Sequence, residues 1–467
     1  MKFTLKFSSD TPKTRGTKKH SAQTKVRKGE SNKNPKNFGE RLFLCDEIPQ
    51  NKWIASLIGA LCALFFSAFI YLEHFLGDSN APIFSTICAL CGIFLYFKLS
   101  RLGAFICGAL IGILWFYWVG FSFRFFGIAY LIPLVWIVFA LIYGGIFFLF
   151  FFFKSPIYRL FALTLSSWIH PFGFNWFILE SMLSKSYFSP SKFTLFLLLI
   201  GVLIFSLMLT KKLYKAGVVW ILSFYLILFG FQDSINWDSK PKPQTPTQLK
   251  IQTLSLNIPQ NLRWDSKHLQ TIIAQNYDKI RQAKAQNYDL VILPETAFPL
   301  ALNLYPSLIE SLKEASADIA ILTGSLYQEN HKIFNSAYLF QNGEMQVFHK
   351  QILVPFGEQI PLPHFLASWI NKTFFEGAED FEQAKLQSPN STLIGNERFQ
   401  IAICYEATRE EFYQNSPQNL IAISNNAWFS PSIEPTLQKL LMLYFAKNYG
   451  TTIFHSSNAS LDFTLKP

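Results

Sequence analysis

The sequence predicts a two-part protein in which a polytopic α-helical membrane domain precedes an α/β domain. Half of the 467 residues are hydrophobic and only 15% are charged, a balance typical of membrane proteins. The long uncharged apolar runs lie before residue 232, whereas short strand and helix patterns alternate after residue 247. We therefore expect four segments, at residues 1–52, 53–231, 232–247 and 248–467.

The first segment, residues 1–52, is a basic and polar tail. It holds thirteen Lys and Arg residues against five Asp and Glu residues, and so carries +8 of the net charge of +11. Too few of its residues are apolar to build a core, so we predict that it is disordered. Positive charge before a first membrane span keeps that end in the cytoplasm, and we prefer this explanation to nucleic-acid binding.

The second segment contains seven apolar runs that are candidate membrane spans. They cover residues 53–72, 82–97, 103–123, 128–153, 158–183, 195–210 and 216–231. The fifth run has the weakest pattern because His170, Pro171 and Gly173 interrupt it, although proline is tolerated where neighbouring helices satisfy the freed backbone groups.

The charges of the connecting loops orient these spans. The loops after the second, fourth and sixth runs are basic, as cytoplasmic loops are. Their basic residues are Lys98, Arg101, Lys154, Arg159, Lys211, Lys212 and Lys215. Arg124, Lys185 and Lys192 fall in the opposite loops and are exceptions. An odd number of spans then places everything after residue 232 outside the cytoplasm.

The α/β domain follows a Pro-rich linker within residues 232–247. We expect strands at 249–258, 289–293, 319–322, 336–340, 345–348, 399–403, 420–423 and 451–455, and helices from Ser266 and over 434–448. Asn342-Gly343 is a strong hairpin signal. Cys404 is the one cysteine of this domain, so it has no disulfide partner there, and the Cys88-x-x-Cys91 pair inside an apolar run indicates packing.

Three polar residues stand where predicted strands or hairpin arms end. They are Glu295, Lys350 and Cys404. Taken singly, each has an ordinary explanation, as a charge at a helix N-terminus, a solvated lysine and a buried cysteine. Taken together, they supply a base, a cation and a nucleophile. Because Tyr405 and Glu406 fit the first turn of a helix, we expect the helix dipole to lower the pKa of the Cys404 thiol.

The strings around these residues resemble those of the nitrilase superfamily. They are Leu-Pro-Glu ending at Glu295, His-Lys-x3-Val-Pro-Phe-Gly-Glu ending at Glu358, and Cys-Tyr-Glu beginning at Cys404. Joined to a multi-span N-terminal half, they are similar to the apolipoprotein N-acyltransferase family in particular. The resemblance implies a nitrilase-like αββα sandwich for residues 248–467, and a chemistry that requires neither cofactor nor metal.

The resemblance also implies the roles of the residues. Cys404 would form a thioester with the acyl group, Glu295 would take its proton, and Lys350 with the Tyr405 N–H would stabilise the oxyanion. The supporting positions that the resemblance implies are Glu358, Tyr405, Glu406, Trp264 and Asn335. Asn426 stands where the family string usually carries Asp, so the family's charge is absent there.

The implied reaction moves the sn-1 acyl chain of a phospholipid, with phosphatidylethanolamine as the expected donor, to the α-amino group of the diacylglyceryl cysteine of a lipoprotein. The enzyme would lie in the inner membrane with its catalytic domain on the periplasmic side. Two alternatives stay open. One is a nitrilase-type amidase on a membrane anchor. The other is an inactive family member, because the chain ends at Pro467, where the family normally continues through further strands and a last span.

Overall fold

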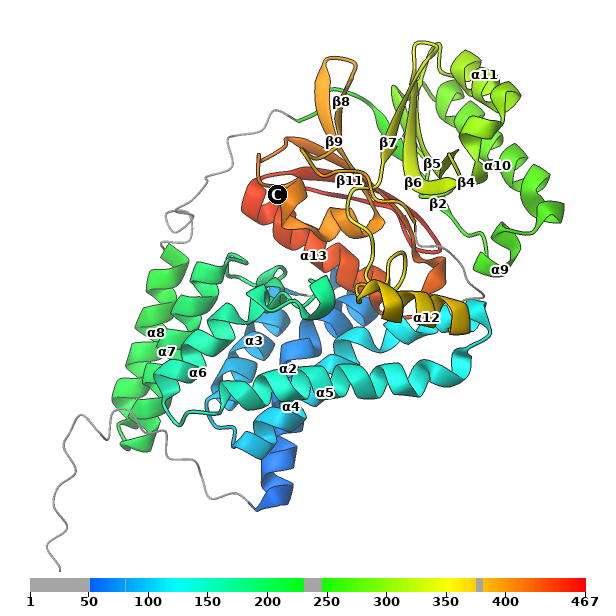
Figure 1. Cartoon of the computed structure of the whole chain (residues 1–467). Helices are drawn as coiled ribbons and strands as arrows, with labels where there is room; N and C mark the ends of the chain where they lie inside the picture. Colours follow the sequence, from blue (N-terminus) through cyan, green and yellow to red (C-terminus); the bar gives the residue numbers. More distant parts are fainter. Residues whose placement is uncertain (1–50, 80, 231–245, 375–380) are drawn as a thin grey trace, which may run out of the picture. The chain divides into compact units, whose positions relative to one another are not determined.

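The structure is a computed structural model that describes residues 51–79, 81–230, 246–374 and 381–467. The predicted disordered tail, except for its last two residues, and most of the predicted linker therefore lie outside the described residues. The described chain consists of a helical part followed by a two-sheet α/β part (Figure 1).

Six of the seven predicted apolar runs form helices. The helical part comprises α2 (Lys52–Leu76), α3 (Pro82–Tyr96), α4 (Arg101–Phe116), α5 (Ile132–Phe150), α6 (Pro156–Thr164), α7 (Lys192–Thr210) and α8 (Tyr214–Gly230). Four described helical stretches are long and apolar enough to cross a membrane: Lys52–Leu76, Arg101–Phe126, Ala129–Phe150 and Lys192–Thr210. The other two helices that coincide with predicted runs, α3 and α8, are apolar but shorter.

The prediction of a continuous fifth span over residues 158–183 is wrong. Helix α6 is only nine residues long, and short 3-10 turns at Leu165–Trp168, Pro171–Gly173 and Leu179–Leu183 follow it. Pro171 lacks an N–H donor and disfavours helical backbone at the preceding residue. Residues 175–184 of this irregular segment are buried, whereas Leu165, Trp168, Ile169 and Phe172 are exposed. Where the segment meets the α/β part, its backbone groups find partners, because the Gly173 carbonyl and the Asn175 N–H both bind the Tyr405 hydroxyl.

This broken segment nevertheless runs from one end of the helices to the other. At its start, the Tyr158 hydroxyl donates to the Leu149 carbonyl near the end of α5 (3.2 Å). Further along, Trp176 Nε1 donates to Thr408 Oγ1 of the α/β part (2.7 Å). Helix α4 ends beside the α/β part, where Trp118 packs on Phe429 with ring centroids 4.8 Å apart, so Arg101 at the start of α4 lies at the remote end. Arg101 Nη2 donates to the Phe152 carbonyl at 2.8 Å, so the basic loop after α5 lies at that end too.

The α/β part contains two six-stranded sheets. The first has the order β1-β3-β5-β6-β7, with β4 beside β5, and the second has the order β12-β11-β10-β9-β8, with β2 beside β11. The strands of the first sheet are β1 (Ile251–Thr253), β3 (Leu290–Ile292), β4 (Phe298–Ala301), β5 (Ala320–Glu329), β6 (Lys332–Gln341) and β7 (Glu344–His349). Those of the second are β2 (Ser255–Leu256), β8 (Ser391–Ile394), β9 (Glu397–Ile403), β10 (Asn419–Asn425), β11 (Thr452–Asn458) and β12 (Phe463–Leu465).

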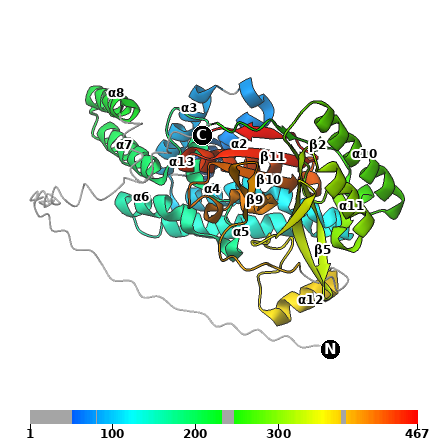
Figure 2. The ribbon, with the colours of Figure 1, turned by 90° about the horizontal axis from the view of Figure 1, so that it is seen from above.

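The two sheets pack face to face, and helices cover their outer faces (Figures 1 and 2). Ile292 and Leu322 of the first sheet share a buried core with Ile401 and Ile423 of the second. Helices α10 (Ser266–Ala285) and α11 (Pro306–Ala315) cover the first sheet, and α13 (Glu434–Tyr449) covers the second. The predicted αββα sandwich is therefore confirmed. The α/β part also contains the helices α9 (Gln260–Arg263) and α12 (His364–Phe374).

Two expectations for this part need correction. The run 249–258 does not form one strand, because the chain passes from the first sheet to the second at the buried Leu254, between β1 and β2. The residues after 451 form β11 and the unpredicted edge strand β12, so the second described sheet has as many strands as the first.

Helix α13 joins the second sheet to the membrane helices. A single buried core runs from α2 and α4 through α13 to the outer face of β9 and β10. Two buried carboxylates of the helical part also face α13. Glu73 of α2 lies 2.9 Å from Lys439 Nζ, and Glu180 accepts from the Tyr444 hydroxyl at 3.4 Å. The α/β part is thus packed against the helices through both apolar and charged contacts.

Candidate active site

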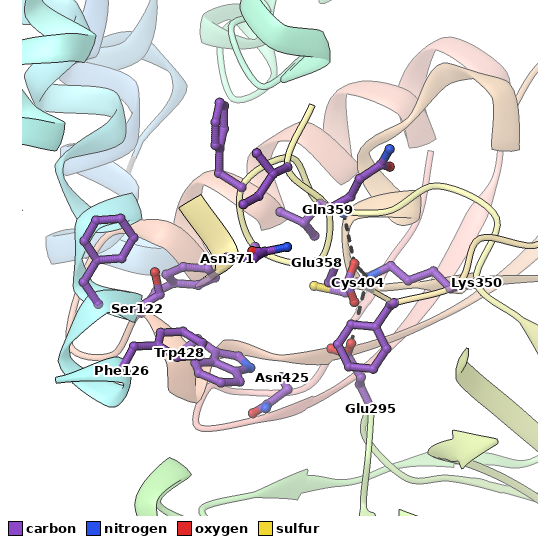
Figure 3. Close-up of a pocket in the computed structure, with 17 residues that line it drawn as sticks. Ser122, Phe126, Glu295, Lys350, Glu358, Gln359, Asn371, Cys404, Asn425 and Trp428 are labelled. Atoms are coloured by element: carbon purple, nitrogen blue, oxygen red, sulfur yellow. Dashed lines mark hydrogen bonds and ion pairs between the residues drawn. The ribbon is translucent and has the colours of Figure 1, made fainter. Parts of the chain in front are cut away.

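Glu295, Lys350 and Cys404 converge at one edge of the sandwich. They follow β3, β7 and β9 respectively, so three strand ends from the two sheets deliver an acid, an amine and a thiol. Lys350 Nζ lies 4.0 Å from Glu295 Oε1, and Cys404 lines the same pocket (Figure 3). The structure therefore brings together the three residues singled out from the sequence.

The backbone at Cys404 has an unusual conformation. Cys404 has φ 54°, and two other non-glycine residues at the site, Thr296 (φ 46°) and Phe356 (φ 61°), also have positive φ. Such conformations cost about 1–3 kcal/mol each and persist where surrounding structure enforces them. Here Thr296 directly follows Glu295, and Phe356 and Cys404 line the pocket, so three such residues lie at the site.

The expected lowering of the thiol pKa by a helix dipole is wrong. Residues Cys404–Thr408 form one five-residue 3-10 turn and not the start of a longer helix. Burial raises the pKa of the Cys404 thiol well above its ordinary value, the nearby Glu295 raises it further, and Lys350 lowers it only in part. The thiol is therefore neutral at rest and needs a base to become a nucleophile.

Glu295 is suited to that role. Burial raises the pKa of its carboxyl above the ordinary value, and Glu358 adds to this effect, while Lys350 and Asn335 oppose it. Asn335 Nδ2 donates to Glu295 Oε1 at 2.6 Å and to Glu358 Oε1 at 2.9 Å, so one amide orients both carboxyls. A base with a raised pKa can take the thiol proton and return it at near-neutral pH.

Lys350 is a buried cation held by Glu358. Its Nζ lies 2.6 Å from Glu358 Oε2, and that same oxygen accepts from the Val354 N–H at 2.9 Å. Burial alone would lower the pKa of Lys350, but the charges of Glu358 and Glu295 outweigh burial and raise it. Lys350 therefore remains an ammonium, as an oxyanion-stabilising group must.

Glu406 lies beneath the nucleophile turn and ties it to the loop after β7. Its carboxyl accepts backbone N–H bonds from Ile403 (2.8 Å), Ile352 (3.0 Å) and Gln351 (2.5 Å). Burial raises the pKa of Glu406 to about 7, although these donors and Lys350 lower it. By binding these backbone N–H groups, Glu406 holds the chain segments that carry Cys404 and Lys350 in place.

Tyr405 points into the broken fifth segment. Its hydroxyl donates to the Gly173 carbonyl (3.1 Å) and accepts from the Asn175 N–H (2.9 Å). Its ring stacks on Phe174, with ring centroids 6.0 Å apart. The residue that follows Cys404 is therefore fixed by the membrane half of the chain.

The structure does not bring Trp264 to this pocket. Its side chain is 48% exposed and lines a separate hollow beside Leu300 and Tyr305. Asn426, which replaces the family's usual Asp, is buried and donates from Nδ2 to Ser460 Oγ at 3.1 Å. An ionised aspartate could not make that donation, so the amide fits this site.

Sequence reasoning missed the wall of the pocket that faces the three converging residues. This wall comes from the 3-10 stretch η2 (Tyr117–Phe126) of the membrane half and from the loop after β10. Its residues are Ser122, Phe123, Phe126, Asn425, Trp428 and Phe429 (Figure 3). The wall is largely aromatic and apolar. Among the described residues, no cluster of three or more His, Cys, Asp or Glu residues could hold a metal ion.

Comparisons with known sequences point to one family. Residues 53–227 match the apolipoprotein N-acyltransferase integral membrane domain. The chain is 39% identical over 398 residues to the apolipoprotein N-acyltransferase of Wolinella succinogenes, covering 85% of this chain and 92% of that relative. It is 37% identical over 373 residues to that of Helicobacter pylori, covering 80% and 85%. Among solved structures, a nitrilase-superfamily amidase of Nesterenkonia AN1 matches 48% of this chain and 85% of its own, with 14% identity and a TM-score of 0.35.

Proposed function

Because this chain belongs to the apolipoprotein N-acyltransferase family, we propose that it transfers a phospholipid acyl chain, through a thioester on Cys404, to the N-terminal diacylglyceryl cysteine of lipoproteins. The observation that carries this proposal is the composition of the pocket. An acid, an ammonium and a thiol line one side, and aromatic residues of the membrane half line the other. A pocket of this kind suits a reactive ester that is attached to long apolar chains.

The first step forms the acyl-enzyme. The Glu295 carboxylate takes the proton of Cys404 Sγ, and the thiolate attacks the ester carbonyl carbon, so that an S–C bond forms. The Lys350 ammonium and the Tyr405 backbone N–H stabilise the resulting oxyanion. The ester C–O bond then breaks, and Glu295 returns the proton to the leaving alkoxide of the lysophospholipid.

The second step consumes the acyl-enzyme. The α-amino nitrogen of the lipoprotein attacks the thioester carbonyl and gives up a proton to Glu295. An amide C–N bond forms, the C–S bond breaks, and the Cys404 thiolate leaves and is reprotonated by Glu295. Both steps use the same base and the same oxyanion donors, so one pocket serves two successive substrates.

We propose phosphatidylethanolamine as the acyl donor, and the periplasmic side of the inner membrane as the location of the catalytic part. The support for this location is the distribution of charge. The basic loops at 98–101 and 211–215 join helix ends remote from the α/β part, because the chain contacts that part just after α4, at Trp118, and just before α7, at Pro190. Basic loops on the side away from the catalytic part are expected for cytoplasmic loops. The apolar wall from η2 favours lipid substrates over the small soluble amides of an anchored amidase.

The experiment that tests the function uses the full chain in detergent with phosphatidylethanolamine and a synthetic diacylglyceryl lipopeptide. With donor alone, intact-protein mass spectrometry should show one acyl group on the protein, located on the peptide that contains Cys404. Adding the lipopeptide should discharge this adduct and give an N-acylated product. A protein that forms no adduct and leaves the lipopeptide unmodified would overturn the proposal.

The rate of acyl-enzyme formation should rise with pH through the raised pKa of the Glu295 carboxyl. Only the ionised carboxylate can accept the thiol proton, and burial raises its pKa above the ordinary value, so the rise lies at higher pH than for an exposed glutamate. The check is the single-turnover rate of adduct formation between about pH 5 and 9. In Glu295→Gln this rise should disappear along with most of the rate. A wild-type rate that falls across this range would contradict the assignment of Glu295 as the base.

A further inference from the structure

Three basic residues lie at the end of the membrane helices that faces the α/β part, where the loops are otherwise not basic. Two of them form ion pairs with buried carboxylates. Lys185 Nζ lies 2.6 Å from Glu73 Oε2, and Lys192 Nζ lies 2.6 Å from Glu180 Oε1. The third, Arg124, is exposed and makes no ion pair with any carboxylate in the described part of the chain. Among the residues that the structure describes, this fixed cation has no counter-charge at this end of the helices.

The guanidinium of Arg124 is held in a defined position. Its Nε donates to the Phe121 carbonyl at 2.9 Å, and its Nη2 donates to the Ser430 carbonyl at 2.8 Å. Its centre lies 4.6 Å from the Phe121 ring centroid and 5.8 Å from that of Phe125. A guanidinium has five N–H groups, and these two bonds leave both N–H groups of Nη1 and one of Nη2 for a ligand.

Arg124 also joins the two segments that form the aromatic wall of the pocket. Phe123 and Phe126 on its own element line the pocket, and Ser430, which it binds, directly follows the lining residue Phe429. Phe126 and Trp428 stack across the same junction, with ring centroids 5.7 Å apart and planes 11° apart. The cation therefore lies beside the aromatic wall opposite Cys404, and not at a remote surface.

We propose that Arg124 binds the phosphodiester group of the acyl-donor phospholipid and so positions the donor's ester in the Cys404 pocket. This inference rests on the proposed function. A phosphodiester carries one negative charge and oxygens that match the fork of N–H donors on a guanidinium. Phospholipid phosphates lie at the membrane surface, where an exposed arginine at the end of membrane helices can meet them. The acyl chains then extend along the aromatic wall.

The test compares two acyl donors in a phosphate-free maltoside detergent. One is phosphatidylethanolamine, and the other is a p-nitrophenyl fatty-acid ester, which has no phosphate. For Arg124→Gln we expect the KM for phosphatidylethanolamine to rise about tenfold, with kcat within about twofold, because charge-assisted bonds to the donor are lost. Acylation of Cys404 by the p-nitrophenyl ester should be unchanged. Arg124→Lys keeps the positive charge but not the planar set of N–H donors of a guanidinium. It should give an intermediate KM for phosphatidylethanolamine.

The matched control is Lys215→Gln, which removes an exposed cation at the start of α8, at the opposite end of the helices, and should leave both donors unaffected. If Arg124→Gln lowers the rate of acylation by both donors equally, Arg124 serves only to hold η2 against the loop at Ser430, and the inference is overturned. An unchanged KM for phosphatidylethanolamine would overturn it as well. A wild-type protein that accepts an acyl group from neither donor would instead refute the proposed function itself.

Discussion

Replacing Cys404 by serine should lower the rate of lipoprotein N-acylation by about 10⁴-fold or more, the scale seen when a catalytic nucleophile is removed. The serine hydroxyl is far less acidic than a thiol, and the same buried environment that raises the pKa of the Cys404 thiol disfavours an alkoxide even more. The measurement is the rate of lipopeptide acylation at saturating phosphatidylethanolamine, together with mass spectrometry of the protein after donor alone.

Cys88→Ser is the matched control, because it changes a partly buried cysteine of α3 outside the pocket and should retain activity. If Cys404→Ser still acylated the lipopeptide at a rate within about tenfold of the wild type, a thioester on this residue could not be on the reaction path.

Replacing Lys350 by methionine should damage both stability and catalysis. It leaves the carboxyls of Glu295 and Glu358 buried without their cation, and removing one partner of a buried ion pair typically costs about 3–5 kcal/mol. It also removes one oxyanion donor, which typically costs about 10²–10³-fold in kcat. Thermal unfolding in detergent and the rate of adduct formation on Cys404 measure the two losses separately.

A second variant separates these two effects. Adding Glu358→Gln to Lys350→Met removes one uncompensated carboxyl, and should recover part of the thermal stability without recovering activity. Lys332→Met, which breaks an exposed ion pair with Glu382 (2.8 Å), should change stability by no more than about 1 kcal/mol. Full activity in Lys350→Met would show that the oxyanion is stabilised elsewhere.

The sequence predicted most of the helices and the three converging residues because their signals are local. Apolar runs of sufficient length, strand ends and the strings around Glu295, Lys350 and Cys404 are all visible without tertiary structure. The αββα order followed from the resemblance, and the core shared by the two sheets confirms it.

The features that the sequence did not reveal depend on contacts between distant segments. The interruption at Pro171 and Gly173 is stable because its polar groups meet the α/β part, and hydropathy alone does not indicate this. The η2 wall was missed because Phe123 and Phe126 extend an apolar run and carry no separate signal. The pKa expected for Cys404 had the wrong direction because burial and neighbouring carboxylates outweigh a single short turn.

The support of Tyr405 by residues 173–175 has a consequence for how this enzyme can be divided. A fragment beginning at residue 248 would keep Glu295, Lys350 and Cys404, but it would lose the contacts that hold Tyr405. It would also lose the part of the pocket wall that Ser122, Phe123 and Phe126 form. The reaction therefore requires both halves of the chain. An exchange of domains between relatives would have to replace the two halves together.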